Sequence, residues 1–201
     1  MAVEFASIVL AGGMGRRLGR DKLWLELGGE NLPRMVLRTL SALGGPVVLV
    51  LDRQKPVPPL PHSVKVVTDL LPGRGSLGGI YTGLKLADAD RVLAVACDMP
   101  FLSIPLLRHL LKLSPDYDVV VPRLKGGLEP LHAVYGRGCL GPMERLLGTP
   151  SNRIFDFYHE VRVQYVGEEV VDRLSPGHMS FFNINTPADL KQAQRLVKDA
   201  A

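Results

Sequence analysis

The chain has few cysteines, no long apolar run and no tail of like charges. Cys97 and Cys139 are the two cysteines among 201 residues, and neither forms a CxxC pair or a cluster with histidine. Two cysteines in this arrangement do not build a disulfide framework and do not indicate zinc. The sequence therefore predicts reduced thiols in a cytoplasmic protein.

No apolar run reaches the ~18 residues of a membrane-spanning helix. The first residues, MAVEFASIVLAGG, carry no basic segment ahead of the apolar one, so they do not resemble a signal peptide. These absences predict a cytoplasmic location and no membrane partner.

The composition is that of an ordinary globular chain, with 46% hydrophobic and 22% charged residues. This length suits one domain, spanning 1–201, with a single core. The net charge is +4, and one short segment supplies three of these charges, because Arg16, Arg17, Arg20 and Lys22 face a single acid there, Asp21. Basic residues gathered in one loop favour a small anionic ligand over nucleic acid, whose footprint would spread along a face.

Apolar, β-branched runs alternate along the chain with helical patterns. We expect strands at 5–11, 46–51, 64–68, 91–97, 118–122, 130–135, 161–166 and 181–184. We expect helices at 33–43, 79–87, 104–113, 139–147 and 187–198. The early runs are continuously apolar, as in strands that helices cover on both faces. The pattern predicts an α/β domain with three layers, α/β/α, and a mainly parallel, mixed central sheet.

Polar residues follow several of these strands directly. In such sheets, ligands bind beyond the carboxyl ends of the strands, near a switch in strand order. The residues in this position are the glycine-rich loop after 5–11, Asp52, Asp69, Asp98, and the pair Asn183 and Asn185. Together they predict one binding site at one edge of the sheet.

The loop LAGGMGRRLGRDK (10–22) is typical of turns that bring backbone N–H groups to a phosphate. It departs from the dinucleotide fingerprint G-x-G-x-x-G, because Leu18 stands where the third glycine belongs and Gly19 comes one place late. No acidic residue follows about 20 positions beyond the loop. Four cations also exceed what a dinucleotide needs. The loop therefore disfavours a dehydrogenase and favours a more highly charged ligand.

Asp98, in the segment CDMPFL, is the strongest single candidate for a functional residue. A carboxylate at the end of a buried strand is costly unless it is paired or bound to a cation, and Mg²⁺ commonly takes only one or two protein carboxylates. The alternative is an N-cap for the helix at 104–113, for which Ser103 is better placed. Asp98 is thus a candidate magnesium ligand.

The other candidates each have a plain structural reading. Lys22 and Arg17 are either phosphate contacts or solvated charges, and Asp69 is either a base or ribose contact or a turn residue. The glycines of 72–79 permit a tight turn or form a smooth floor for a purine. His132 lies in an apolar alternating run, which favours a buried strand histidine over a ligand. With no nucleophile elbow and no paired catalytic carboxylates, the pattern suggests attack of a substrate phosphate on a nucleoside triphosphate.

Four segments, LAGGMGRRLGRDK, CDMPFL, EPLHAVY and NINTPADL, resemble those of molybdenum cofactor guanylyltransferases, the MobA family. Their order and spacing cover 7–190. The resemblance implies a nucleotide-diphospho-sugar transferase fold, GTP and Mg²⁺, and transfer of GMP to molybdenum-loaded molybdopterin with release of pyrophosphate. It also implies cofactor-handling proteins and acceptor molybdoenzymes as partners, and no nucleic acid. We expect about 1–100 to bind the nucleotide and about 101–201 the acceptor.

By position, the resemblance also assigns individual residues. Backbone groups of Leu10, Ala11, Gly12 and Gly13 would hold the nucleotide. Lys22 would contact its phosphates, Asp69 would help to select guanine, and Asp98 would hold Mg²⁺. From the four cations of the loop, not from the resemblance, we expect Lys22 and Arg17 to stabilise the departing pyrophosphate, with Arg16 and Arg20 nearer solvent. Asp52 departs from the asparagine that is common in the family, and an anionic side chain cannot donate the corresponding hydrogen bond.

Two alternatives stay open at this stage. A related enzyme of the same fold would use CTP or a sugar phosphate. A nonenzymatic nucleotide- or cofactor-binding protein would need the glycine loop but not Asp98.

Overall fold

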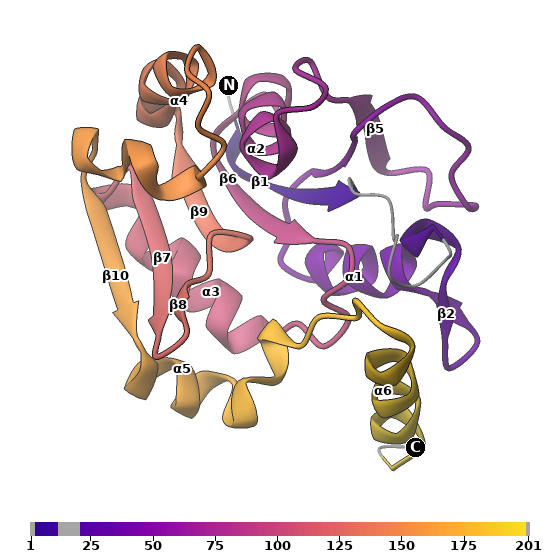
Figure 1. Ribbon diagram of the computed structural model, residues 1–201. Coiled ribbons are helices and arrows are strands. Elements are labelled where there is room, and N and C mark those ends of the chain that lie inside the picture. Colours follow the sequence, from indigo (N-terminus) through magenta and orange to yellow (C-terminus); the bar gives the residue numbers. More distant parts are fainter. Residues whose placement is uncertain (1–2, 12–20, 200–201) are drawn as a thin grey trace.

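The central sheet has the first strand of the chain in its middle. The protein is described here by a computed structural model covering residues 3–11 and 21–199 (Figure 1). Within these residues the main sheet has eight strands in the order β10-β7-β9-β6-β1-β4-β5, with β8 paired to β7. The strands are β1 (Val3–Ala11), β4 (Val47–Leu51), β5 (Val64–Thr68), β6 (Ala89–Ala96), β7 (Val119–Leu124), β8 (Gly127–Leu128), β9 (His132–Gly136) and β10 (Val163–Gly167).

Most strand pairs of this sheet are parallel. β1 pairs in parallel with β4 and β6, β4 with β5, and β7 with β10. β9 runs antiparallel between β6 and β7, and β8 is antiparallel to β7. The expected mixed, mainly parallel sheet is confirmed.

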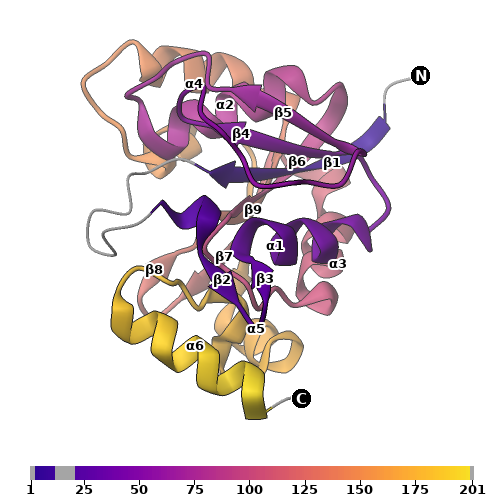
Figure 2. The same ribbon diagram turned by 90° about the vertical axis from the view of Figure 1, so that its right-hand side faces the viewer.

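Helices cover both faces of the sheet, as Figure 2 shows. On one face α2 (Gly75–Leu86) and α4 (Leu140–Leu147) share a core with the sheet. On the other face α1 (Leu32–Ser41), α3 (Ile104–Leu113) and α5 (Glu168–Leu174) share a second core. The three-layer prediction is confirmed. Among the helices of the described residues, none is long and apolar enough to span a membrane.

A third, smaller cluster joins the early and late parts of the chain. The antiparallel hairpin β2 (Glu26–Leu27) and β3 (Glu30–Asn31) packs near α6 (Pro187–Asp199), around Leu25, Leu32, Ile184 and Ala193. The short 3₁₀ helices are η1 (Lys22–Trp24), η2 (Ser114–Asp116), η3 (Arg137–Cys139), η4 (Ile154–Glu160) and η5 (Pro176–Phe181). This cluster holds η1 close to the segment that follows η5.

Helix α2 begins at Gly75, four residues before the expected start. Its glycines are required by a close approach to β1. A Cβ added at Gly83 would lie 2.5 Å from Ile8 Cδ1, and one at Gly79 would lie 3.1 Å from Leu10 Cδ2. Gly75 and Gly78, which the sequence placed in a turn, belong to the start of this helix, and Gly79 and Gly83 let the helix pack directly on the strand.

The strand expected at 181–184 is wrong. Phe181 ends η5, and 182–184 continue without joining the sheet. Ile184 N–H donates a hydrogen bond to the carbonyl of Asp98, just after β6, at 3.0 Å. Phe182 and Ile184 pack into the third cluster and Phe181 packs against the second core, so the segment is as hydrophobic as a strand without being one. Helix α5 and the hairpin β2–β3 were not expected.

The expected starts of α3 and α6 are confirmed. Ser103 caps α3, accepting a hydrogen bond from Leu106 N–H at 3.4 Å. At α6, Thr186 Oγ1 accepts from Asp189 N–H at 3.2 Å, and the Asp189 carboxylate accepts from Thr186 N–H at 2.8 Å. This reciprocal capping box fixes the chain directly after Asn185.

Candidate active site

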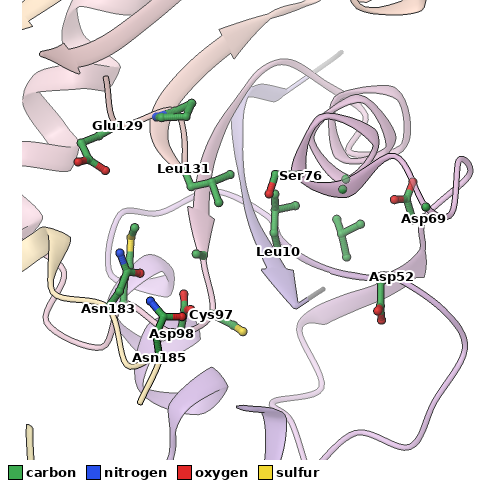
Figure 3. A pocket seen from close by; sticks show the side chains of 17 residues that line it. Leu10, Asp52, Asp69, Ser76, Cys97, Asp98, Glu129, Leu131, Asn183 and Asn185 are labelled. Atoms are coloured by element: carbon green, nitrogen blue, oxygen red, sulfur yellow. The ribbon is translucent and has the colours of Figure 1, made fainter. Parts of the chain in front are cut away.

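A cavity of about 580 Å³ opens at the carboxyl ends of the central strands (Figure 3). The strand order switches between β1 and β6, since β4 and β5 continue from β1 to one side and β6 lies on the other. Leu10 near the end of β1, Asp52 after β4, Asp69 after β5 and Asp98 after β6 all line the cavity. The predicted convergence of polar residues on one edge is confirmed for these positions.

Lys22, Asp98 and Asn185 form a polar cluster at this edge. The Lys22 ammonium makes an ion pair with Asp98 and donates to Asn185 Oδ1 at 2.5 Å. The side chains of Lys22 and Asp98 are each 14% exposed, so the pair is largely desolvated but reachable. Lys22 begins η1, where Asp21 caps the turn by accepting from Leu23 N–H at 3.0 Å. The structure thus joins three residues that the sequence placed in separate motifs.

Asp69 is 8% exposed and has one oxygen engaged by the protein. Its Oδ1 accepts from Thr82 Oγ1 at 2.7 Å and from Leu71 N–H at 3.0 Å. Among the described residues, no hydrogen bond reaches Oδ2. The hydrogen bonds to Oδ1 fix the carboxylate, leaving Oδ2 available as an acceptor for a ligand.

Asp52 lines the cavity and also forms an ion pair with Lys55. Lys55 Nζ lies 3.7 Å from Asp52 Oδ1 and 3.1 Å from Asp21 Oδ2. This lysine, whose side chain is 12% exposed, thereby ties the segment after β4 to the residue that precedes Lys22. Sequence reasoning missed it, since Lys55 stands in a proline-rich connection with no motif around it.

Glycines form one wall of the cavity. Gly73, Gly75 and Gly79 line it, and a Cβ built at Gly73 or Gly75 meets no atom within 4 Å. The side chain of Leu10 packs over Gly79, and the Leu10 carbonyl accepts from Cys97 N–H at 3.1 Å. Ala11 is 2% exposed and pairs with Leu51. This wall has the smooth apolar character expected for a base.

Asn183 and Glu129 line the cavity on the side away from Asp69, as Figure 3 shows. Asn183 donates to the Phe181 carbonyl at 3.3 Å, which orients its amide. Glu129 was not a sequence candidate, although it begins the segment EPLHAVY. The segment EPLHAVY was one of the four that resemble the MobA family. A single carboxylate beside a proline, however, gave no chemical reason to select Glu129 from it.

The other reactive-looking side chains near the cavity are not poised for catalysis. Burial raises the pKa of the Cys97 thiol to about 12, with the charge of Asp98 adding to the effect, so it is not a thiolate near neutral pH. His132 is fully buried in β9, and burial lowers its pKa to about 3. Its Nε2 lies 3.0 Å from Ser180 Oγ, and its ring lies 4.6 Å from that of Phe181. The prediction of a buried strand histidine is confirmed.

Several predicted residues lie outside the described residues. These are Gly12, Gly13, Arg16, Arg17 and Arg20, so their roles stay predictions.

The oxygens around Asp98 are of the kind that a hard divalent cation takes, although Lys22 holds Asp98 Oδ2 and Asn185 Oδ1 in this structure, so the ion would use Asp98 Oδ1 or replace the ammonium there. Asp98 supplies a carboxylate at the cavity edge, and Asn183 and Asn185 add amide groups nearby. Mg²⁺ is commonly held by one or two carboxylates, with water and substrate phosphates completing its shell. No group of three or more His, Cys, Asp or Glu side chains with metal-binding spacing occurs in the part of the chain that the structure describes. The site therefore suits a cation shared with a phosphate ligand better than a cation held by protein alone.

The fold and this site together define a nucleotidyltransferase-type α/β domain. The chain belongs to the family of MobA-like NTP transferase domains, whose model matches residues 7–193. The MobA resemblance seen in the sequence is thus confirmed.

Individual relatives agree with the family. A probable molybdenum cofactor guanylyltransferase of Pelotomaculum thermopropionicum is 38% identical over 198 residues, which cover 98% of this chain and 96% of the relative. A molybdenum cofactor guanylyltransferase of Desulfosudis oleivorans is 36% identical, with 95% of each chain covered. The crystal structure of molybdopterin-guanine dinucleotide biosynthesis protein A from Archaeoglobus fulgidus has a TM-score of 0.82 and 29% identity, covering 96% of this chain and 99% of that chain.

Proposed function

We propose that the protein transfers GMP from GTP to molybdenum-loaded molybdopterin and releases pyrophosphate. The observation that carries the proposal is the arrangement of the cavity, with a partly free carboxylate, Asp69, beside a glycine wall and the Lys22–Asp98–Asn185 cluster across from it. The names of the relatives supply the acceptor class. A protein that only bound a nucleotide would need the glycine wall but not a desolvated lysine and carboxylate at the phosphate end.

The reaction needs positioning and charge stabilisation more than acid–base chemistry. A phosphate oxygen of the acceptor attacks the α-phosphorus of GTP, the bond to the bridging oxygen of the β-phosphate breaks, and pyrophosphate leaves with the electron pair. The Lys22 ammonium, already desolvated, stabilises negative charge that builds on the phosphates. Arg17 is proposed to act in the same way.

Asp98 and the amides of Asn183 and Asn185 would hold Mg²⁺ in this proposal. The ion would supply Lewis-acid stabilisation of the phosphate charges. The backbone of 182–185 is positioned for this by the hydrogen bond from Ile184 N–H to the Asp98 carbonyl and by the capping box of α6. The cytoplasmic location belongs to the same proposal, supported by the two buried free thiols.

Asp69 is proposed to select guanine. Its free Oδ2 can accept from the N1–H and the 2-amino group of guanine, whereas cytosine offers a different edge. A buried carboxylate left facing the wrong base loses its partners, which produces strong discrimination. In this proposal the backbone of Leu10, Ala11, Gly12 and Gly13 holds the rest of the nucleotide.

The test is a turnover assay with molybdenum-loaded molybdopterin, Mg²⁺, and GTP, CTP, ATP or UTP offered separately. Pyrophosphate release with GTP far above the other three is expected. Asp69→Asn should reduce the preference for GTP over CTP, while Asp116→Asn, at an exposed position in η2, should leave it unchanged. Preferred turnover of CTP by the wild type would overturn the guanylyl assignment, and binding of GTP without any turnover would favour a carrier.

A further inference from the structure

Glu129 lines the cavity, and the proposed reaction assigns no role to its carboxylate. It is half-buried, and no hydrogen bond or ion pair within residues 3–11 and 21–199 reaches its carboxylate. Burial raises the pKa of this carboxyl, while the charge of His178 acts in the opposite direction. A carboxylate that has lost part of its hydration without gaining a partner is stabilised by any pair of N–H donors brought to it.

The backbone holds Glu129 firmly in place. Its N–H donates to the Pro122 carbonyl of β7 at 3.1 Å, and its carbonyl accepts from His132 N–H of β9 at 3.0 Å. Pro130 follows directly and also lines the cavity. The side chain is therefore presented from a fixed turn between two strands rather than from a mobile loop.

Asp69 and Glu129 lie at opposite sides of the cavity, with Asp98 and Asn185 at its rim between them (Figure 3). The cavity thus has a carboxylate at each side and the Lys22–Asp98–Asn185 cluster between them, and this order matches the parts of the proposed product. That product has a guanine at one end, a diphosphate in the middle and a pterin at the other end. Guanine and pterin share the same 2-amino-4-oxopyrimidine edge, which offers a ring N–H and an amino N–H side by side.

We propose that Glu129 recognises the pterin end of the acceptor, accepting hydrogen bonds from its ring N–H and 2-amino group. The inference rests on the proposed function and adds a residue that determines acceptor specificity. A carboxylate facing two parallel donors makes the strong, charge-assisted form of this contact. Leu131 also lines this part of the cavity and supplies an apolar surface for the ring.

Binding of small probes tests the contact without turnover. Pterin and lumazine differ at C2, where lumazine carries a carbonyl in place of the amino group. Both are titrated by their fluorescence against protein saturated with GTP and Mg²⁺, so that the guanine end is filled. The wild type should bind pterin about 10- to 100-fold more tightly than lumazine, and Glu129→Gln should lose this preference. The matched control is Glu169→Gln, an exposed glutamate of α5, which should keep it.

Kinetics separate failure of this inference from failure of the proposed function. With GTP and molybdenum-loaded molybdopterin, Glu129→Gln should raise the KM for the acceptor about 10- to 100-fold and leave the KM for GTP unchanged. A wild type without GTP-dependent turnover would overturn the proposed function itself. An active wild type whose acceptor KM is unaltered by Glu129→Gln, or which binds pterin and lumazine equally, would overturn the role of Glu129 alone.

Discussion

His132 should make the stability of the protein depend on pH in mildly acidic solution. It is fully buried in β9, and burial holds its pKa at about 3, against 6.5 for an ordinary histidine. Between these two values the unfolded chain binds a proton at this residue and the folded chain does not. Stability therefore rises with pH across this window and is lost as the pH falls below about 6.5.

The size of the effect follows from the same two pKa values. Each pH unit inside the window costs up to about 1.4 kcal/mol, so lowering the pH from 6.5 to 4.5 removes up to about 2.7 kcal/mol through this one group. The loss falls on the contact between β9 and η5, where His132 meets Ser180 and Phe181. Because η5 leads directly to Asn183 and Asn185, protonation of His132 should also destabilise the positions of these two candidate magnesium-binding residues.

Urea denaturation followed by circular dichroism at pH 4.5, 5.5, 6.5 and 7.5 measures this dependence. The variant His132→Gln removes the titrating group, and its stability should vary less between pH 4.5 and 6.5 by up to about 2.7 kcal/mol. The matched control is His62→Gln, at an exposed position, which should retain the dependence of the wild type. Equal pH dependence in His132→Gln and the wild type would refute the reasoning.

Three further substitutions test the site and the packing around it. Asp98→Asn should keep the fold and lower the transfer rate more than ~100-fold, about 2.7 kcal/mol, in assays with titrated Mg²⁺; near-normal rates at limiting Mg²⁺ would leave Asp98 a structural residue. Lys22→Ala should lower kcat and kcat/KM together by ~100-fold, independently of salt, whereas the exposed Lys125→Ala should change neither; a salt-sensitive rise in KM alone would contradict a catalytic role. Gly83→Ala should destabilise the protein by about 1–2 kcal/mol in urea denaturation, because its Cβ would lie 2.5 Å from a side chain of β1, while Gly126→Ala, with open space around it, should be nearly neutral.

The sequence was sufficient to predict the sheet and its functional edge, because both depend on local patterns. Continuous apolar runs marked the parallel strands, and Asp52, Asp69 and Asp98 directly followed three of them. Topology then brought those residues to one cavity without further information. The helix caps at Ser103 and Thr186 were predictable for the same reason, since capping is a local interaction.

Features set by tertiary contacts were not predictable. The close approach of Gly79 and Gly83 in α2 to Leu10 and Ile8 is a tertiary contact, which no local pattern records. The segment 181–184 has the hydrophobicity of a strand but finds no partner in the sheet. Lys55 and Glu129 became visible only when the fold placed one beside Asp21 and the other at the end of the cavity.

The hydrogen bond between Lys22 and Asn185 spans 163 positions of the sequence. A contact of this separation forms only after the intervening chain has been ordered, because closing so long a loop costs entropy that earlier contacts must first offset. The central sheet contains no residue of the segment that carries Asn185. Most of the core can therefore form while the edge of the cavity around Lys22, Asp98 and Asn185 is still incomplete. Completion of that edge requires docking of 182–185 and of α6, so we expect it to form late in folding.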